Sequence, residues 1–246
     1  MYTEITPLTA THAHEGRSSR YQFISTADVI QTFNEQGFEV SNVQYPKVRK
    51  ESKLGFNGHL VRMRQTNLSS YNEEVPEVLL INSHDGTKAF RLGLGFFRFV
   101  CSNGLIVGDF MADSGRIAHK GQAAVEVLNY ISEYSKNVTS KILQITDMKN
   151  TVLSSSDLEE FQNKAGSIVH PSLIQSEQLL HIHRMTDKQP TVWNAFNVAQ
   201  ENAMKGNYQI IGANSNPRKA RPIKDITRNI EVNTKLWKLA EEFIVG

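Results

Sequence analysis

Two kinds of spacing between apolar residues divide the chain into two halves. Between residues 38 and 121, short segments alternate apolar and polar positions, as in residues 61–64, and this alternation predicts β-strands. Residues 78–81 form a continuous apolar run, which is typical of a strand buried on both faces. Beyond residue 121 the apolar spacing becomes helical, so the predicted fold class is α+β.

The first half is predicted to be rich in strands and to contain one helix. Residues 1–20 are polar and are expected to form a flexible N-terminal arm. Ser25 or Thr26 can cap a helix that ends at Gly37, where a left-handed residue is expected. The strands that follow predict an antiparallel or mixed sheet, so residues 21–121 are assigned to one sheet-rich α+β region.

The second half, residues 122–246, is predicted to be mainly helical. Apolar residues recur every seven positions from Ile131 to Val152, which indicates a helix of about eight turns. Ser156 and Glu159 have the spacing of a capping box, so a second helix is expected to follow and form an antiparallel hairpin with the first. Further helices come after it. We expect this helical region to pack on the sheet region as one integrated domain.

Composition is that of an ordinary globular protein of 246 residues, with 39% hydrophobic and 21% charged residues. No run of about 18 apolar residues is present, so neither a transmembrane helix nor a membrane partner is expected. The start of the chain also lacks the features of a secretory signal. The single cysteine, Cys101, excludes an intramolecular disulfide and Cys-x-x-Cys metal sites, which favours a cytoplasmic location.

Positive charges gather in two clusters, although the net charge is only +2. One cluster lies on and before a predicted strand, where alternation places Arg62 and Arg64 on the same face. Tyr45 and Phe56 lie close to it in sequence, and cations with aromatic rings on a sheet are typical of single-strand binding. A solvated sheet face is the alternative interpretation. The residues predicted to bind nucleic acid are Lys47, Arg49, Lys53, Arg62, Arg64, Arg98, Arg218, Arg221 and Arg228.

An arginine and the only cysteine belong to one predicted strand. Arg98 alternates with apolar residues, and a buried arginine needs a carboxylate or phosphate partner. We favour a structural ion pair over a nucleic-acid contact for it. Cys101 has no sequence signature of a nucleophile and is interpreted as a small apolar residue, so no catalytic residue is assigned. Asn103 and Gly104 predict a turn after this strand.

Three histidines are candidates for metal ligands. His59, His84 and His119, together with Asp85 or Glu77, could hold a metal ion if the fold brought them together, but the histidine spacings of 25 and 35 residues match no local motif. They are interpreted as structural polar residues. His181 and His183 lie two positions apart on a predicted helix, where such positions do not face each other. No metal site and no cofactor are therefore predicted.

Short strings along nearly the whole chain carry a family resemblance. They are residues 21–26 with 29–30, 59–64, 76–86, 97–109 and 119–121 in the first half, and residues 193–197 with 200–202, 227–228 and 233–241 in the second. Together they resemble the phage and plasmid family catalogued as domain of unknown function 932. Its members resemble cargo of mobile elements and are found near anti-restriction and DNA-repair-like genes. The resemblance implies a protein in the cytoplasm of a bacterial host and offers no established catalytic residues.

Three functions are compatible with these observations. The one we expect is a non-enzymatic protein of a mobile element that binds single-stranded DNA, as an annealing or protective factor that could form homo-oligomers. The second is a modulator of host defence that binds a host protein; a DNA mimic would need an acidic surplus, which this chain lacks. The third is a metal-dependent enzyme that acts on nucleic acid through His59, His84 and His119.

Overall fold

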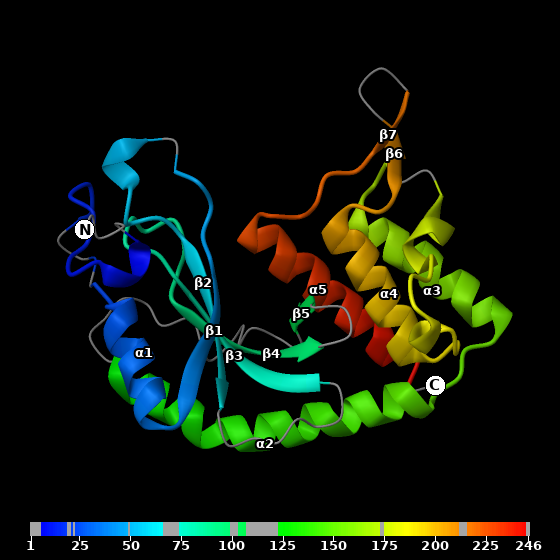
Figure 1. Cartoon of the computed structure of the whole chain (residues 1–246), viewed down its shortest axis with the longest axis horizontal. Helices are drawn as coiled ribbons and strands as arrows, with labels where there is room; N and C mark the ends of the chain where they lie inside the picture. Colours follow the sequence, from blue (N-terminus) through cyan, green and yellow to red (C-terminus); the bar gives the residue numbers. More distant parts are fainter. Residues whose placement is uncertain are drawn as a thin grey trace. The chain divides into compact units, whose positions relative to one another are not determined.

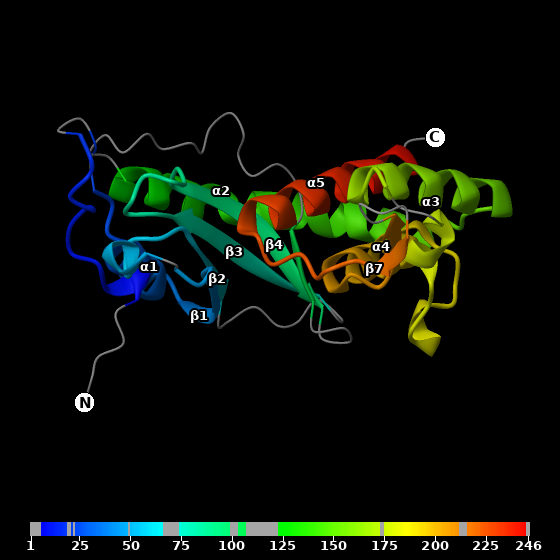
Figure 2. The same ribbon diagram turned by 90° about the horizontal axis from the view of Figure 1, so that it is seen from above.

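The computed structural model describes most of the chain, in two compact units. The described residues are 6–18, 21, 23–48, 50–65, 74–98, 103–106, 123–172, 175–211 and 216–244. The first unit comprises residues 1–104 and 109–138, and the second comprises residues 105–108 and 139–246. The division therefore falls within a long helix, α2 (Ala123–Asn150), and not before it. Figures 1 and 2 show the elements in two views.

The sheet has its strands in chain order, β1-β2-β3-β4-β5. Their bounds are β1 (Phe38–Gln44), β2 (His59–Gln65), β3 (Glu74–Asn82), β4 (Arg91–Arg98) and β5 (Asn103–Ile106). Neighbouring strands from β1 to β4 pair antiparallel. With one helix before the sheet and helices after it, the predicted α+β class is confirmed. The expected turn at Asn103 and Gly104 is instead the start of β5.

The first unit is built around the central strand β3. All nine of its residues are buried, which confirms the prediction for the apolar run at residues 78–81. The helix α1 (Thr26–Glu35) begins where the Ser25 hydroxyl accepts a hydrogen bond from the backbone N–H of Asp28. It carries Phe33 against Phe38 at the start of β1, with ring centroids 5.3 Å apart. A short 3-10 turn, η1 (Pro7–Thr9), precedes α1, and another, η2 (Glu51–Lys53), precedes β2.

The second unit is a cluster of helices with a small two-stranded sheet. Its elements are α3 (Ser155–Val169), η3 (Ser176–Leu180), η4 (Met185–Asp187), α4 (Val192–Lys205), β6 (Gln209–Ile211), β7 (Pro217–Lys219) and α5 (Ile226–Glu242). Helix α3 packs mainly on α4, α5 and η3. Trp193 and Phe196 of α4 meet Trp237 of α5, with ring centroids 6.5 and 5.5 Å away. These rings form the centre of the apolar core.

Two helix boundaries differ from the sequence-based prediction. The capping box of α3 uses Ser154 and Asp157, because the Ser154 hydroxyl accepts from Asp157 N–H and the Asp157 carboxylate accepts from Ser154 N–H. It therefore lies two residues before the predicted pair. Val152, the last residue of the predicted apolar stripe, follows the end of α2 and is 68% exposed. Within the described residues, no helix is both long and apolar enough to span a membrane.

Candidate functional site

Strands β6 and β7 form a two-stranded antiparallel ribbon, and Figure 1 shows it extending beyond the helices of the second unit. Gln209 pairs with Lys219, and Ile210 pairs with Arg218. Because side chains alternate along a strand, the first pair lies on one face of the ribbon and the second pair on the other. Each face borders a cavity, and Tyr208 lines both cavities. We call them the polar cavity and the basic cavity.

The basic cavity has a volume of about 380 Å³. Arg218, Arg221 and Arg228 line it together with His170 and Tyr208. Burial raises the pKa of the Tyr208 hydroxyl, which therefore stays protonated and able to donate a hydrogen bond. Three guanidinium groups and a phenol around one cavity are suited to an anionic ligand with several oxygen atoms.

Arg228 has a structural role as well as a place in the cavity wall. Its Nη2 donates to the backbone carbonyl oxygens of Ile168 and Val169, at 3.1 and 2.9 Å, and Nη1 donates to Glu231 at 2.8 Å. The two carbonyls belong to the last turn of α3, where a cation is favoured by the helix dipole. Arg228 therefore fixes the start of α5 to the end of α3, and Glu231 balances part of its charge.

Arg218 and Arg221 carry charge that no carboxylate balances. Both side chains are exposed, and neither forms an ion pair within the described part of the chain. The same holds there for Lys219 and Lys224, which are also exposed. Four positive charges within one short segment create a local positive potential that attracts anions.

The polar cavity, on the other face of the ribbon, has a volume of about 520 Å³. The residues that line it include His181, His183, Asn207, Gln209 and Lys219. The two imidazole rings meet edge to face, with centroids 5.1 Å apart. The prediction that these histidines lie on a helix and point apart was wrong. Residues 181–183 lie in no helix, and the backbone of His181 and of Arg184 is extended, a conformation in which side chains two positions apart lie on the same side.

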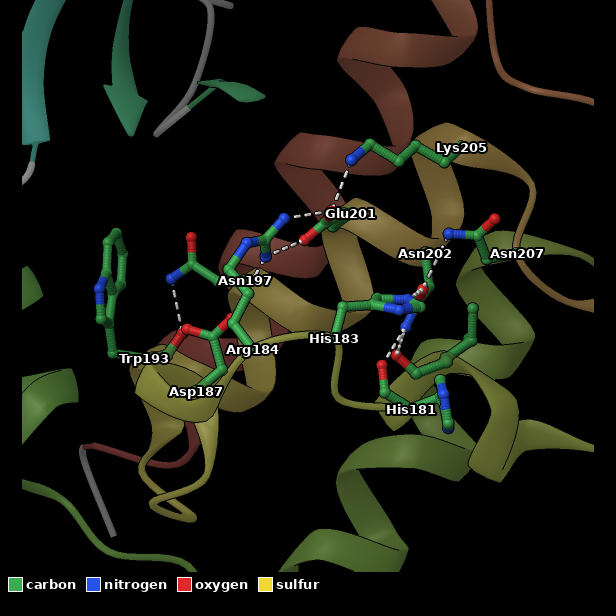
Figure 3. Close-up of polar contacts among 11 residues, drawn as sticks. His181, His183, Arg184, Asp187, Trp193, Asn197, Glu201, Asn202, Lys205 and Asn207 are labelled. Carbon is green, nitrogen blue, oxygen red and sulfur yellow. Dashed lines mark hydrogen bonds and ion pairs between the residues drawn. The ribbon is translucent and has the colours of Figure 1, made fainter. Parts of the chain in front are cut away.

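The side chain of Asn202 holds the histidine segment in place (Figure 3). Its Nδ2 donates to the backbone carbonyls of Leu179 and His181, at 2.9 and 3.0 Å. Its Oδ1 accepts from His183 Nε2 at 2.7 Å and from Asn207 Nδ2 at 3.3 Å. Asn202 is fully buried, and all four hydrogen-bonding positions of its amide are used. The His183 ring is therefore fixed in one orientation.

An ion-pair network anchors the residue that follows His183. Arg184 donates from both Nη atoms to the Glu201 carboxylate, at 2.5 and 2.6 Å, and Lys205 donates to it as well (Figure 3). Burial opposes ionisation of Glu201, but the hydrogen bonds from Arg184 and Lys205 prevail and lower its pKa to about 2. Asp187 also accepts from Arg184, at 3.3 Å. The network binds the extended segment to α4.

No role was predicted from the sequence for four polar residues of α4. Asn197, Gln200, Glu201 and Asn202 are all buried, each with at most 3% exposure. Their signal was present in the sequence, because Gln200-Glu201-Asn202 is one of the strings that carry the family resemblance. Polar residues on a helix ordinarily face solvent, whereas these four are buried and support the candidate site.

The arginines of β2, in contrast, are neutralised inside the first unit. Arg62 Nη1 donates to Glu77 Oε2 at 2.7 Å, and Arg64 Nε donates to Glu77 Oε1 at 2.8 Å. The prediction that both share one strand face holds, since both reach the same carboxylate. Arg62 is only 4% exposed, and the Arg64 guanidinium lies 4.0 Å from the centre of the Phe97 ring. This arrangement leaves Arg62 unavailable to a phosphate.

Arg98 is also in the interior, at 3% exposure. The register of β3 and β4 places Glu74 directly opposite it, and Glu74 is equally buried. Opposite charges at directly paired positions stabilise a sheet. The register therefore favours the structural interpretation of Arg98 over a nucleic-acid contact.

The remaining cations of the first unit that were predicted to bind nucleic acid are Lys53, Lys47 and Arg49. Lys53 forms an ion pair with Asp85 at 3.2 Å. Burial opposes ionisation of Asp85, but hydrogen bonds from Thr87 and Lys53 prevail and lower its pKa. Lys47 is exposed and forms no ion pair within the described residues. Arg49 lies outside them.

His59 and His84 come together, with ring centroids 5.4 Å apart. His59 Nδ1 donates to the Asn57 carbonyl at 3.0 Å, so its Nε2 accepts from the Thr26 hydroxyl at 2.8 Å. His84 Nε2 donates to the Pro7 carbonyl at 2.8 Å. Burial lowers the pKa of His59 to about 4. These contacts fit the structural interpretation.

The third candidate ligand, His119, and Cys101 both lie outside the described residues. Among the residues that are described, no three His, Cys, Asp or Glu side chains are grouped so that they could hold a metal ion. The described residues therefore contain no group of side chains that would support the metal-enzyme hypothesis.

Comparisons with known proteins agree with the resemblance seen in the sequence. The family model described as "Domain of unknown function (DUF932)" matches residues 13–237. Two proteins of Escherichia coli (strain K12), UPF0380 protein YfjQ and UPF0380 protein YafZ, are each 27% identical to the chain over 236 residues. The aligned regions cover 94% of this chain and 85% of each relative. No solved structure matches the chain.

Proposed function

We propose that this chain, which belongs to the DUF932 family, binds single-stranded DNA through the β6–β7 ribbon and the basic cavity. The observation that carries the proposal is the pair Arg218 and Arg221, exposed beside a cavity that Arg228 also lines. Their charges lack carboxylate partners among the described residues, so a phosphate can pair with them without breaking an existing ion pair.

The arrangement of the cations favours a polymer over a single small anion. Arg218 and Lys219 project from opposite faces of the ribbon, and Arg221 and Lys224 follow in a segment without regular secondary structure. At no more than about 3.3 Å per residue, Arg218 and Arg221 are separated by at most about 10 Å along the chain. Cations distributed over such a length fit successive phosphates of a backbone.

The proposal moves the predicted interface from the sheet to the ribbon. Arg62 and Arg64 both form ion pairs with Glu77, whereas Arg218 and Arg221 form no ion pair with a carboxylate of the described residues. Lys47 is retained as an additional exposed cation. Binding of this kind, independent of sequence, would serve annealing or protection of single strands.

A salt titration tests the proposal. Fluorescence anisotropy with a labelled single strand is measured from about 50 to about 200 mM salt, for wild type and for the double variant R218A/R221A. Counterion release predicts a steep loss of wild-type affinity with salt, and a logarithmic slope that is smaller by about 1.4 when two phosphate contacts are removed. The control is K136A/K164A, which removes two exposed lysines from α2 and α3. No binding at low salt, or equal slopes for the three proteins, contradicts the proposal.

The protein-binding alternative has one observation of its own. Met185 is 74% exposed and Ile182 is 42% exposed, so the segment around η4 presents apolar side chains that could anchor a partner. A pull-down with nuclease treatment separates the two functions. A partner lost on nuclease treatment and on R218A/R221A substitution agrees with DNA binding, whereas a partner lost only in M185A favours the alternative.

A further inference from the structure

We infer that the polar cavity binds an unpaired nucleobase of the strand whose phosphates bind in the basic cavity. The inference rests on the proposed function and adds to it a reason for preferring single strands. It is carried by the juxtaposition of two cavities of different chemistry on the two faces of one ribbon.

The position of the polar cavity is the first argument. Arg218 and Lys219 are consecutive residues, with Cα atoms about 3.8 Å apart, and their side chains project to opposite faces. Arg218 lines the basic cavity, Lys219 lines the polar cavity, and Tyr208 lines both. A DNA strand whose phosphate binds on one face of the ribbon therefore has an adjacent base within reach of the other face.

The chemistry of the polar cavity is the second argument. Asn207 and Gln209 contribute amides, and Glu177 contributes a carboxylate, so the wall offers both donors and acceptors. The edge of a nucleobase presents the same mixture, and unpaired bases in protein complexes stack on rings such as histidine. The volume of about 520 Å³ lies in the range of about 300–1,000 Å³ found for ligand pockets.

Hydrogen bonds hold the His183 ring and the backbone of His181 in place before any ligand binds, which is the third argument. His183 donates to Asn202, and Asn202 also grips the backbone of His181. Arg184, the next residue, is fixed by two hydrogen bonds to Glu201 (Figure 3). A ring that is already ordered loses little freedom when a base stacks on it, and this strengthens binding.

The consequence is a requirement for unpaired bases. In a duplex each base is stacked and paired, so entry into the cavity would require the base to leave the helix at a cost of a few kcal/mol. The ribbon cations alone would bind a duplex and a single strand through their phosphates. The polar cavity, in contrast, selects the single strand.

The experiment compares two probes of about 12 nucleotides with the same number of phosphates. One is oligothymidylate, and the other carries abasic tetrahydrofuran sites throughout. Wild type is expected to bind the base-bearing probe about 5- to 20-fold more tightly. In H181A this preference falls below about threefold, while affinity for the abasic probe stays unchanged. His181 is chosen because its side chain is exposed and the hydrogen bond to Asn202 comes from its backbone carbonyl.

The matched control is H12A, which removes an exposed histidine of the first unit. Equal wild-type affinity for both probes overturns the base site and leaves phosphate binding intact. An H181A variant that loses affinity for both probes to the same extent also overturns it. Failure of wild type to bind either probe at low salt overturns the proposed function and the base site with it.

Discussion

Removal of the Glu77 carboxylate separates the structural role of the β2 arginines from a role in DNA binding. Glu77 is fully buried and accepts hydrogen bonds from Arg62, Arg64 and the Ser41 hydroxyl. In E77A the Arg62 guanidinium stays in the interior without that acceptor. The folded state is therefore destabilised, whereas the ribbon, which belongs to the second unit, keeps its cations.

The size of the destabilisation expected for E77A follows from the burial of the ion pair. Breaking one side of a buried ion pair costs about 3–5 kcal/mol, and the Arg62 side chain is only 5% exposed. The Arg64 side chain is 27% exposed, so its pair with Glu77 adds at most about 1 kcal/mol. We therefore expect E77A to lower the free energy of unfolding by about 3–5 kcal/mol. The double variant R62M/E77L replaces the pair with apolar groups and is expected to recover to within about 1–2 kcal/mol of wild type.

Urea unfolding followed by circular dichroism measures these differences, and DNA affinity is measured on the same proteins under folding conditions. R62M/E77L should bind single-stranded DNA as tightly as wild type, because neither residue faces the ligand in this account. The reasoning is refuted if E77A unfolds at the wild-type urea concentration, or if R62M/E77L is stable but has lost its affinity for DNA. Either result would mean that Arg62 is available to a phosphate.

Three further predictions concern the supports of the site. N202A should lower the free energy of unfolding by about 2–4 kcal/mol, since buried carbonyls and the His183 donor lose their partner; urea unfolding with N202D as a partial replacement measures this. Glu201 has a pKa of about 2 when folded against 4.5 ordinarily, so its stabilisation is complete above about pH 4.5 and is lost as the pH falls toward 2. E201Q should flatten that acid limb of a stability profile, and an unchanged limb would contradict the assignment. Gly206 ends α4 with φ of +67°, and a Cβ there would lie 2.7 Å from the Ala220 carbonyl oxygen, so G206A should cost about 1–3 kcal/mol and weaken DNA binding by displacing Arg221; G16A, at a position where a Cβ meets ordinary contacts, is the control.

The strands and the fold class could be predicted because they depend on local periodicity. The apolar run at residues 78–81 requires burial on both faces wherever its neighbours lie, and β3 provides it. Ser25 and Gly37 likewise mark the ends of α1 by local backbone chemistry. The family could be recognised for a similar reason, since the segments that carry the resemblance are short stretches of contiguous sequence.

The partners of the charged residues could not be predicted, because they depend on strand register. Glu77 lies directly opposite Arg64 and two positions from Leu79, the residue opposite Arg62, and Glu74 lies opposite Arg98. The sequence shows these acids and bases at separations of 13 to 24 residues, with nothing to pair them. As a result the sheet arginines resembled an exposed basic patch, whereas burial gives them a structural role.

Only part of the candidate site could be predicted from the sequence. The cations Arg218 and Arg221 were identified because they belong to a cluster of positive charges along the sequence. The polar cavity was missed because residues 181–183 were predicted to be helical, and helical spacing separates the two rings. The extended conformation depends on Asn202 and Glu201, which lie about 20 residues further along the chain.

Photocrosslinking of a single strand that carries iodouracil identifies the peptides that contact DNA, so it shows whether the ribbon is the binding surface. Crosslinks are expected at the ribbon and its cavities, within residues 170–224, and are expected to be lost in R218A/R221A. Crosslinks confined to β2, at residues 59–65, with R218A/R221A behaving as wild type, would contradict binding at the ribbon.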